Sequence, residues 1–242
     1  MAFLRSSPPR QPIFRAPPVV IWLIAGLAVL HAARVLQPAA RSEAIVGEYA
    51  LIPARYSHAF LAAAHVDPGA WWERAMPFVT YMGLHNDLAH LGINCLFLLA
   101  FGPIVAKRFG ATLFLAFFVI CGVIGGATFV ATNWGEAVPV IGASGAIAGL
   151  MAAAVRMLPT QIPWAMPGET TLAPIFSRQV LLFSVILVAV NVFMGVTGLG
   201  FGSESGMIAW QAHLGGYLAG LLLSGGFDYL RPRPLVRSLS DG

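Results

Sequence analysis

Ser144 and His213 are polar residues of this sequence whose side chains could together perform nucleophilic chemistry. Ser144 stands in the run Gly142-Ala143-Ser144-Gly145, and both Ser144 and His213 lie in stretches of apolar and small residues. A serine hydroxyl is a weak nucleophile until a neighbouring imidazole removes its proton. If the fold brings them together, the pair could attack a carbonyl carbon and transfer an acyl group. Small residues also allow close helix packing, so the serine run by itself indicates a packing notch.

Two further polar residues could stabilise the negative charge that develops in such a reaction. His90 and Asn94 are four residues apart, so they share one face of a helix. Their side chains, together with free backbone N–H groups at a helix start, would donate hydrogen bonds to an oxyanion. The carboxylates of Asp87 and Asp228 fall at the ends of apolar stretches, away from this level. We therefore predict a Ser–His dyad and not a triad.

The elements that must position these residues are membrane-spanning helices. The chain of 242 residues is 58% apolar and 10% charged, whereas soluble domains carry about 25% charged residues. We predict an all-α polytopic membrane protein, a six-helix bundle with a short central helix that carries the serine. The predicted spans, most of them near the ~20 residues that cross a bilayer, are residues 18–36, 88–105, 111–131, 144–158, 179–197 and 207–227.

Composition also excludes several kinds of partner. Thirteen of the fourteen basic residues are arginines, and none belongs to a dense basic run, which argues against nucleic-acid binding. Cys95 and Cys121 lie inside apolar stretches without metal-ligand spacing, so we predict neither a disulfide framework nor a zinc site.

The predicted organisation is one membrane domain between two cytoplasmic tails. The first apolar stretch also has features of a signal-peptide core, but a retained span accounts better for the number of spans. The tails are residues 1–17, which are basic and proline-rich, and residues 228–242; the membrane domain is residues 18–227, with a long outer loop at about 37–87.

The basic residues predict the orientation of the spans. With both termini cytoplasmic, most arginines lie inside, and the short outer loops around Glu136 and Glu204 contain no Lys or Arg. Spans two, four and six then begin at the outer side. The four polar residues that could react lie in the first halves of these spans, so they share one membrane level. We expect this cluster to be open to water from the outer side.

Three motifs on these spans resemble those of the rhomboid intramembrane serine proteases of the bacterial six-transmembrane type. A single Gly-x-Ser-Gly is a weak signal, but three motifs in order on the expected spans are specific. The resemblance covers residues 79–227. The motifs are His85-x4-His90-x3-Asn94, Gly142-x-Ser144-Gly145 and Ala212-His213-x2-Gly216-x3-Gly220.

The resemblance implies a chemical role for four of these residues. Ser144 resembles the nucleophile, and His213 resembles its general base and later acid. His90, Asn94 and the backbone N–H of Ser144 resemble an oxyanion hole. The implied substrates are membrane-anchored proteins, cut within or beside their transmembrane segment in the bacterial inner membrane.

The same resemblance implies supporting roles for other residues, and no cofactor or metal. His85 resembles a position that supports the loop and water access. Gly142 and Gly145 would allow the crowded start of the short helix, and Gly216 and Gly220 would allow its contact with the sixth span.

Three positions depart from the family pattern. Met76-Pro77 stands where many members have Trp-Arg, and Ala106-Lys107-Arg108 stands where many have a glutamate followed by basic residues. Ala148 replaces an aromatic residue that packs on the histidine in many members, so we expect Phe129 or Tyr217 to supply that packing. None of these changes removes a reacting group.

Two other function classes use the same residues. A catalytically inactive rhomboid-like protein would bind transmembrane helices, but intact Ser144 and His213 argue against it. A transporter or channel would need polar groups through the inner half of the membrane, where we place only Asn191. A metal or haem site is less favoured, because histidines five positions apart do not share a helix face.

Overall fold

The chain is all helical in the part that the structure describes. The computed structural model describes residues 16–158, 171–197 and 209–231, and within these ranges the only β pairing is an isolated antiparallel bridge between Leu51 and Val140. This confirms the predicted fold class. The elements are α1 (Pro18–Val35), α2 (Ala39–Tyr49), η1 (Pro53–Tyr56), α3 (His58–Ala64), α4 (Trp71–Ala75), α5 (Pro77–Thr80), η2 (Tyr81–Gly83), α6 (Leu88–Phe109), α7 (Ala111–Thr132), α8 (Ser144–Met157), α9 (Arg178–Thr197) and α10 (Trp210–Leu230).

Helices stand at all six predicted spans, namely α1, α6, α7, α8, α9 and α10. Among the described residues, α1, α6 and α7 are long and apolar enough to cross a membrane by length and composition. The apolar part of α9 is shorter, and α8 has only 14 residues. A helix of 14 residues is too short to cross a bilayer alone, and a helix that begins inside a membrane must turn its first backbone N–H groups toward protein or water.

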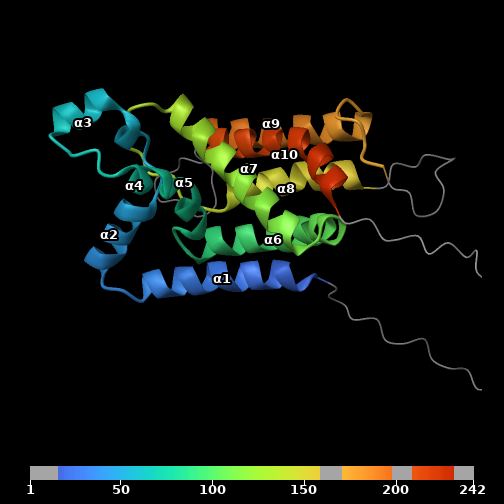
Figure 1. Cartoon of the computed structure of the whole chain (residues 1–242), viewed down its shortest axis with the longest axis horizontal. Coiled ribbons are helices and arrows are strands. Elements are labelled where there is room, and N and C mark those ends of the chain that lie inside the picture. Colours follow the sequence, from blue (N-terminus) through green and yellow to red (C-terminus); the bar gives the residue numbers. More distant parts are fainter. Residues whose placement is uncertain (1–15, 159–170, 198–208, 232–242) are drawn as a thin grey trace, which may run out of the picture.

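The central element is α8, which lies among α6, α7 and α10 (Figure 1). Eleven of its 14 residues are buried, and most of these are alanine or glycine. Small side chains let helix backbones approach closely where no hydrophobic effect drives helix association. By contrast, α1 and α9 lie at the outside of the bundle and expose many apolar side chains.

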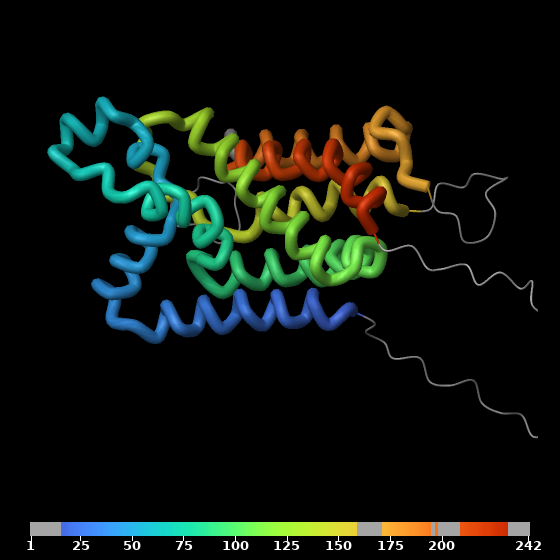
Figure 2. Tube along the Cα trace, viewed as in Figure 1, coloured from blue at the N-terminus to red at the C-terminus, as the bar shows by residue number. Residues whose placement is uncertain are grey.

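The predicted outer loop is folded into short helices at one end of the bundle. Figure 2 shows the segment from α2 to α5 at the end where α6, α8 and α10 begin. The first turns of these three helices therefore lie at the same level, as the alternation of spans predicts.

Long-range hydrogen bonds hold the segments that precede α6 and α8. The guanidinium of Arg34, in the last turn of α1, donates to the backbone carbonyl of His85 at 2.7 Å. The backbone N–H of Gly142 donates to the carbonyl of Tyr81 at 2.9 Å, and the Tyr81 hydroxyl donates to the carbonyl of Gly122 at 2.7 Å. Polar backbone groups in these turns are thus bonded within the protein, as an apolar surrounding requires.

Candidate active site

Ser144 and His213 meet where α8 and α10 pack together. Ser144 is the first residue of α8, and His213 lies in the first turn of α10. The Nε2 atom of His213 is 2.7 Å from the Oγ atom of Ser144. This is hydrogen-bond distance between a hydroxyl and an imidazole, so the ring can accept the hydroxyl proton.

Glycines bring the two helix backbones close enough for this contact. A Cβ atom at Gly216 would lie 2.0 Å from the carbonyl oxygen of Gly145, and one at Gly220 would lie 2.3 Å from that of Gly149. Real Cβ atoms essentially never come this close to backbone. Three of the glycines predicted to support the site, Gly145, Gly216 and Gly220, therefore form the α8–α10 contact itself.

Gly142 makes the sharp turn that leads into α8. Its φ angle is +117°, in the region that L side chains rarely adopt. A Cβ atom here would also lie 2.7 Å from Nε2 of His90. The lack of a side chain at Gly142 therefore permits both this backbone conformation and the close approach of the His90 ring to the turn before Ser144.

His90 and Asn94 lie on α6, and the His90 ring approaches the turn that precedes α8. Asn94 is buried, and its side-chain amide donates to the carbonyl of His90 at 3.0 Å. The backbone N–H of Asn86 donates to Nδ1 of His90 at 3.5 Å. Since Nδ1 accepts a hydrogen bond, the proton of a neutral ring sits on Nε2, the atom beside Gly142. His90 can thus donate toward the region of Ser144.

Asn191 is the polar residue that the sequence reasoning placed wrongly. Its Oδ1 atom is 2.6 Å from Nδ1 of His213. It had been expected in the inner half of the membrane, but α9 runs antiparallel to α8 and α10 (Figure 2), and Asn191 lies in the second half of this helix. The alternation of spans already implies that the fifth span runs in this direction. The sequence therefore contained the signal that places Asn191 level with His213.

His85 lies in the segment before α6, and its ring contacts that of His90. Its side chain is fully buried, and its ring packs edge-on against that of His90 with centroids 5.0 Å apart. Burial, with the neighbouring His90 as a smaller cause, lowers the pKa of His85 to about 4. The ring is therefore neutral at pH 7.

Comparison with known proteins identifies the family to which the chain belongs. Residues 68–227 match the Rhomboid domain family. The chain belongs to the rhomboid family. It is 29% identical over 153 residues to the rhomboid protease GluP of Bacillus subtilis (strain 168), a match that covers 63% of this chain and 25% of GluP. It is 31% identical over 170 residues to the rhomboid protease AarA of Providencia stuartii, covering 64% of this chain and 56% of AarA.

Residues Ala106-Lys107-Arg108, which depart from the family pattern, lie near the end of α6, and Arg108 pairs with a residue of α10. The guanidinium of Arg108 pairs with the carboxylate of Asp228 on α10, with an Nε–Oδ1 distance of 2.6 Å. A second bond joins Nη2 of Arg108 to Oδ2 of Asp228 at 3.0 Å. Two parallel bonds fix the geometry of the pair, so the C-terminal ends of α6 and α10 are joined without a glutamate.

Ala148 lies in a small apolar cluster shared by α8, α9 and α10 of the rhomboid bundle. The cluster includes Tyr217, whose ring stacks on that of Phe183 with centroids 6.3 Å apart. The Tyr217 hydroxyl is 2.8 Å from the hydroxyl of Ser184. Tyr217 thus packs toward α9, and imidazole packing by Tyr217 or Phe129 stays a prediction.

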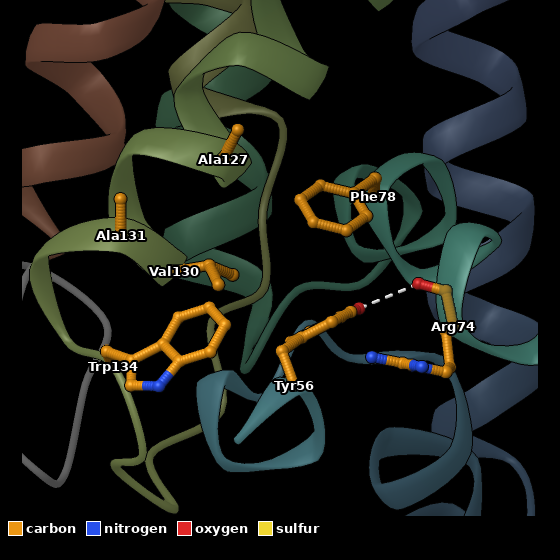
Figure 3. A pocket seen from close by; sticks show the side chains of 7 residues that line it. All are labelled: Tyr56, Arg74, Phe78, Ala127, Val130, Ala131 and Trp134. Carbon is orange, nitrogen blue, oxygen red and sulfur yellow. Dashed lines mark hydrogen bonds between the residues drawn. The ribbon is translucent and has the colours of Figure 1, made fainter. Parts of the chain in front are cut away.

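A cavity of about 500 Å³ lies away from these polar residues. It opens between the outer loop and the end of α7, and the hydroxyl of Tyr56 donates at its rim to the carbonyl of Arg74 at 2.8 Å (Figure 3). None of Ser144, His213, His90 and Asn94 lines this cavity, so the cavity is not the place of the proposed chemistry. Among the described residues no group of three or more His, Cys, Asp or Glu could hold a metal ion. The cavity is lined by Tyr56, Arg74, Phe78, Ala127, Val130, Ala131 and Trp134.

Proposed function

We propose that this rhomboid is an intramembrane serine endopeptidase that cuts membrane-anchored proteins within or beside their transmembrane segment. The observation that carries the proposal is the 2.7 Å contact between Ser144 Oγ and His213 Nε2 at the buried start of α8. The two relatives, GluP and AarA, are both named rhomboid proteases, which supports the same activity.

The reaction would be acyl transfer. As Ser144 Oγ forms a bond to the peptide carbonyl carbon, Nε2 of His213 takes the hydroxyl proton. The imidazolium then gives that proton to the leaving nitrogen as the C–N bond breaks, which leaves an acyl ester on Ser144. Water, deprotonated by the same ring, attacks the ester and restores the hydroxyl.

The negative oxygen of the tetrahedral intermediate needs donors on the other side of the serine. Nε2–H of His90, the free N–H of the Asn94 amide and the backbone N–H of Ser144 are the proposed donors. The first N–H groups of a helix have no partner within that helix, so the start of α8 is suited to hold a developing anion.

The proposed topology places this site toward the outer side of a bacterial inner membrane. Both termini would be cytoplasmic, and the end of the bundle that carries α2–α5 would face outward. Substrate transmembrane segments would reach the site from the bilayer, while water would reach it from the outer side.

The proposal is tested with purified protein and a fluorophosphonate probe, which reacts with activated serines. We expect the wild type to label, and Ser144→Ala and His213→Ala to lose labelling. Ser184→Ala is the matched control, because it removes another serine hydroxyl from a neighbouring helix, and it should label like the wild type. A folded wild type that neither labels nor cleaves a transmembrane substrate in vesicles would instead favour an inactive rhomboid-like protein that binds helices.

Activity should also fall on acidification. His213 must be neutral to accept the serine proton, so protonation of the ring abolishes its role as base. The check is the pH dependence of kcat/KM in vesicles; a profile that stays flat well below the histidine range would contradict the role of His213.

A further inference from the structure

Asn191 meets the imidazole of His213 on the side opposite to Ser144. The Asn191 Oδ1 to His213 Nδ1 distance is 2.6 Å, and the His213 Nε2 to Ser144 Oγ distance is 2.7 Å. We propose that Asn191 is a positioning residue, which fixes the tautomer and orientation of His213 and makes the dyad a Ser144–His213–Asn191 chain. This inference rests on the proposed function.

The orientation of the Asn191 amide follows from its second hydrogen bond. Its Nδ2 atom donates to the backbone carbonyl of Leu187, one turn earlier in α9, at 2.8 Å. A flipped amide would bring two acceptor oxygens together at that carbonyl. Oδ1 therefore faces His213, and because this oxygen can only accept, Nδ1 of the ring carries the proton.

This tautomer is the one that the proposed reaction requires. With the proton on Nδ1, the lone pair of Nε2 points at the Ser144 hydroxyl and can take its proton. In serine proteases an aspartate plays this orienting part, and in papain-like proteases an asparagine does. When His213 becomes an imidazolium, the Asn191 carbonyl dipole also stabilises the new charge on the Nδ1 side.

The surroundings of Asn191 favour an amide for this task. Beside it lies a cavity of only about 20 Å³, whose other lining residues are apolar or aromatic. Asn191 is half-buried, and a carboxylate among these side chains would be costly to desolvate, whereas an amide with both groups bonded is satisfied without a charge. In such a low-dielectric region, a hydrogen bond is stronger than in water. The other lining residues are Leu187, Val188, Val192, Trp210 and Leu214.

A second hydrogen bond between α9 and α10 provides a matched control. The Ser184 hydroxyl is 2.8 Å from the Tyr217 hydroxyl, two helical turns from Asn191 along α9. Ser184→Ala thus removes an α9–α10 side-chain bond without touching His213. If Asn191 only held the two helices together, the two positions would behave alike.

The experiment measures kcat, KM, labelling rate and melting temperature of Asn191→Ala, Asn191→Asp and Ser184→Ala on one transmembrane substrate in vesicles. We expect Asn191→Ala to lower kcat and the labelling rate about 100-fold, as misplacement of a catalytic group does, with KM and melting temperature close to those of Ser184→Ala. We expect Ser184→Ala to keep wild-type kcat.

The aspartate variant separates positioning from a purely structural role. A carboxylate at this place stabilises the imidazolium, so the acid limb of the pH–kcat profile should move to higher pH by about one unit or more. Among the described residues, His90 on α6 is the titratable group whose charge acts on His213, and it is present in every variant. At the upper plateau of the profile, the carboxylate can still accept from Nδ1–H of His213, so Asn191→Asp should be more active than Asn191→Ala, although it loses the bond to the Leu187 carbonyl.

Two results would overturn the inference while leaving the proposed function intact. One is an Asn191→Ala enzyme with wild-type kcat and pH profile. The other is a loss of kcat that Ser184→Ala reproduces with the same fall in melting temperature, together with an unshifted profile for Asn191→Asp. A wild type that neither cleaves nor labels would instead refute the proposed function.

Discussion

The two sides of Ser144 are built differently. On the α9–α10 side, both ring nitrogens of His213 contact side chains of other helices, at 2.7 Å and 2.6 Å. On the α6 side, Asn94 donates to the carbonyl of His90 at 3.0 Å, and His90 accepts from the backbone N–H of Asn86 at 3.5 Å. Side-chain bonds between helices hold the proposed base, whereas bonds within one short stretch of chain hold the proposed oxyanion donors.

This difference shows how each side can fail. The base side needs α8, α9 and α10 to pack correctly, because the described hydrogen bonds of the His213 ring go to Asn191 on α9 and Ser144 on α8. On the α6 side, hydrogen bonds within the helix and the residues just before it orient His90 and Asn94. Asp87 caps this helix, because its side chain accepts a hydrogen bond from the His90 backbone N–H at 2.8 Å. Each N–H of an amide can donate one bond, so Asn94 keeps a second donor for a developing oxyanion.

The sharpest test of the α6 side is Asn94→Ala. If the Asn94 amide donates to the oxyanion, kcat should fall about 10²- to 10³-fold, or roughly 2–4 kcal/mol of transition-state stabilisation. KM should change little, since the donor acts on a charge that the substrate lacks. Cys95→Ala, at the next position of the same helix, serves as the control. Equal turnover in the two variants would remove Asn94 from the site.

The base side is tested by adding a methyl group to the helix contact. Gly216→Ala places a Cβ atom 2.0 Å from the Gly145 carbonyl oxygen, so α8 and α10 must separate, at a cost of about 3 kcal/mol in the free energy of unfolding. The labelling rate of Ser144 should fall with it. Gly225→Ala, also in α10, has nothing within 4 Å of its new Cβ atom and should stabilise slightly. Similar unfolding midpoints for both variants would contradict the close contact.

The third and smallest effect concerns His85. Burial lowers its pKa to about 4, while an unfolded histidine has a pKa of about 6.5. At pH values between these two pKa values, the unfolded state binds a proton at this histidine and the folded state does not. The free energy of unfolding therefore falls as the pH falls. The slope is about 1.4 kcal/mol per pH unit, or about 2 kcal/mol between pH 6 and pH 4.5.

Unfolding in detergent at several pH values checks this slope. His85→Gln should remove it, whereas His58→Gln, at an exposed position, should keep it. If the wild type and His85→Gln lose stability in parallel on acidification, other groups must account for the acid sensitivity, and the α6 side would not depend on a neutral His85.

The pattern of apolar residues predicts the helical fold, and the structure differs from this prediction at the bounds of some helices. The second span was expected to end at residue 105, but α6 continues to Phe109. The apolar run stops at Lys107 and Arg108, whereas the helix continues, and the Arg108 guanidinium in its last turn pairs with Asp228 on α10. The hydropathy of one segment contains no information about an ion-pair partner 120 residues away in the sequence.

The sequence by itself predicts which residues could react and places them at one level of the bundle. Ser144, His213, His90 and Asn94 stand out because polar side chains are costly in apolar helices, and the alternating direction of the spans gives their depth. Only the tertiary structure decided which side chains touch. Whether Asn191 meets His213 depends on how α9 is rotated against α10, and that rotation is set by packing among α8, α9 and α10, which no single helix encodes.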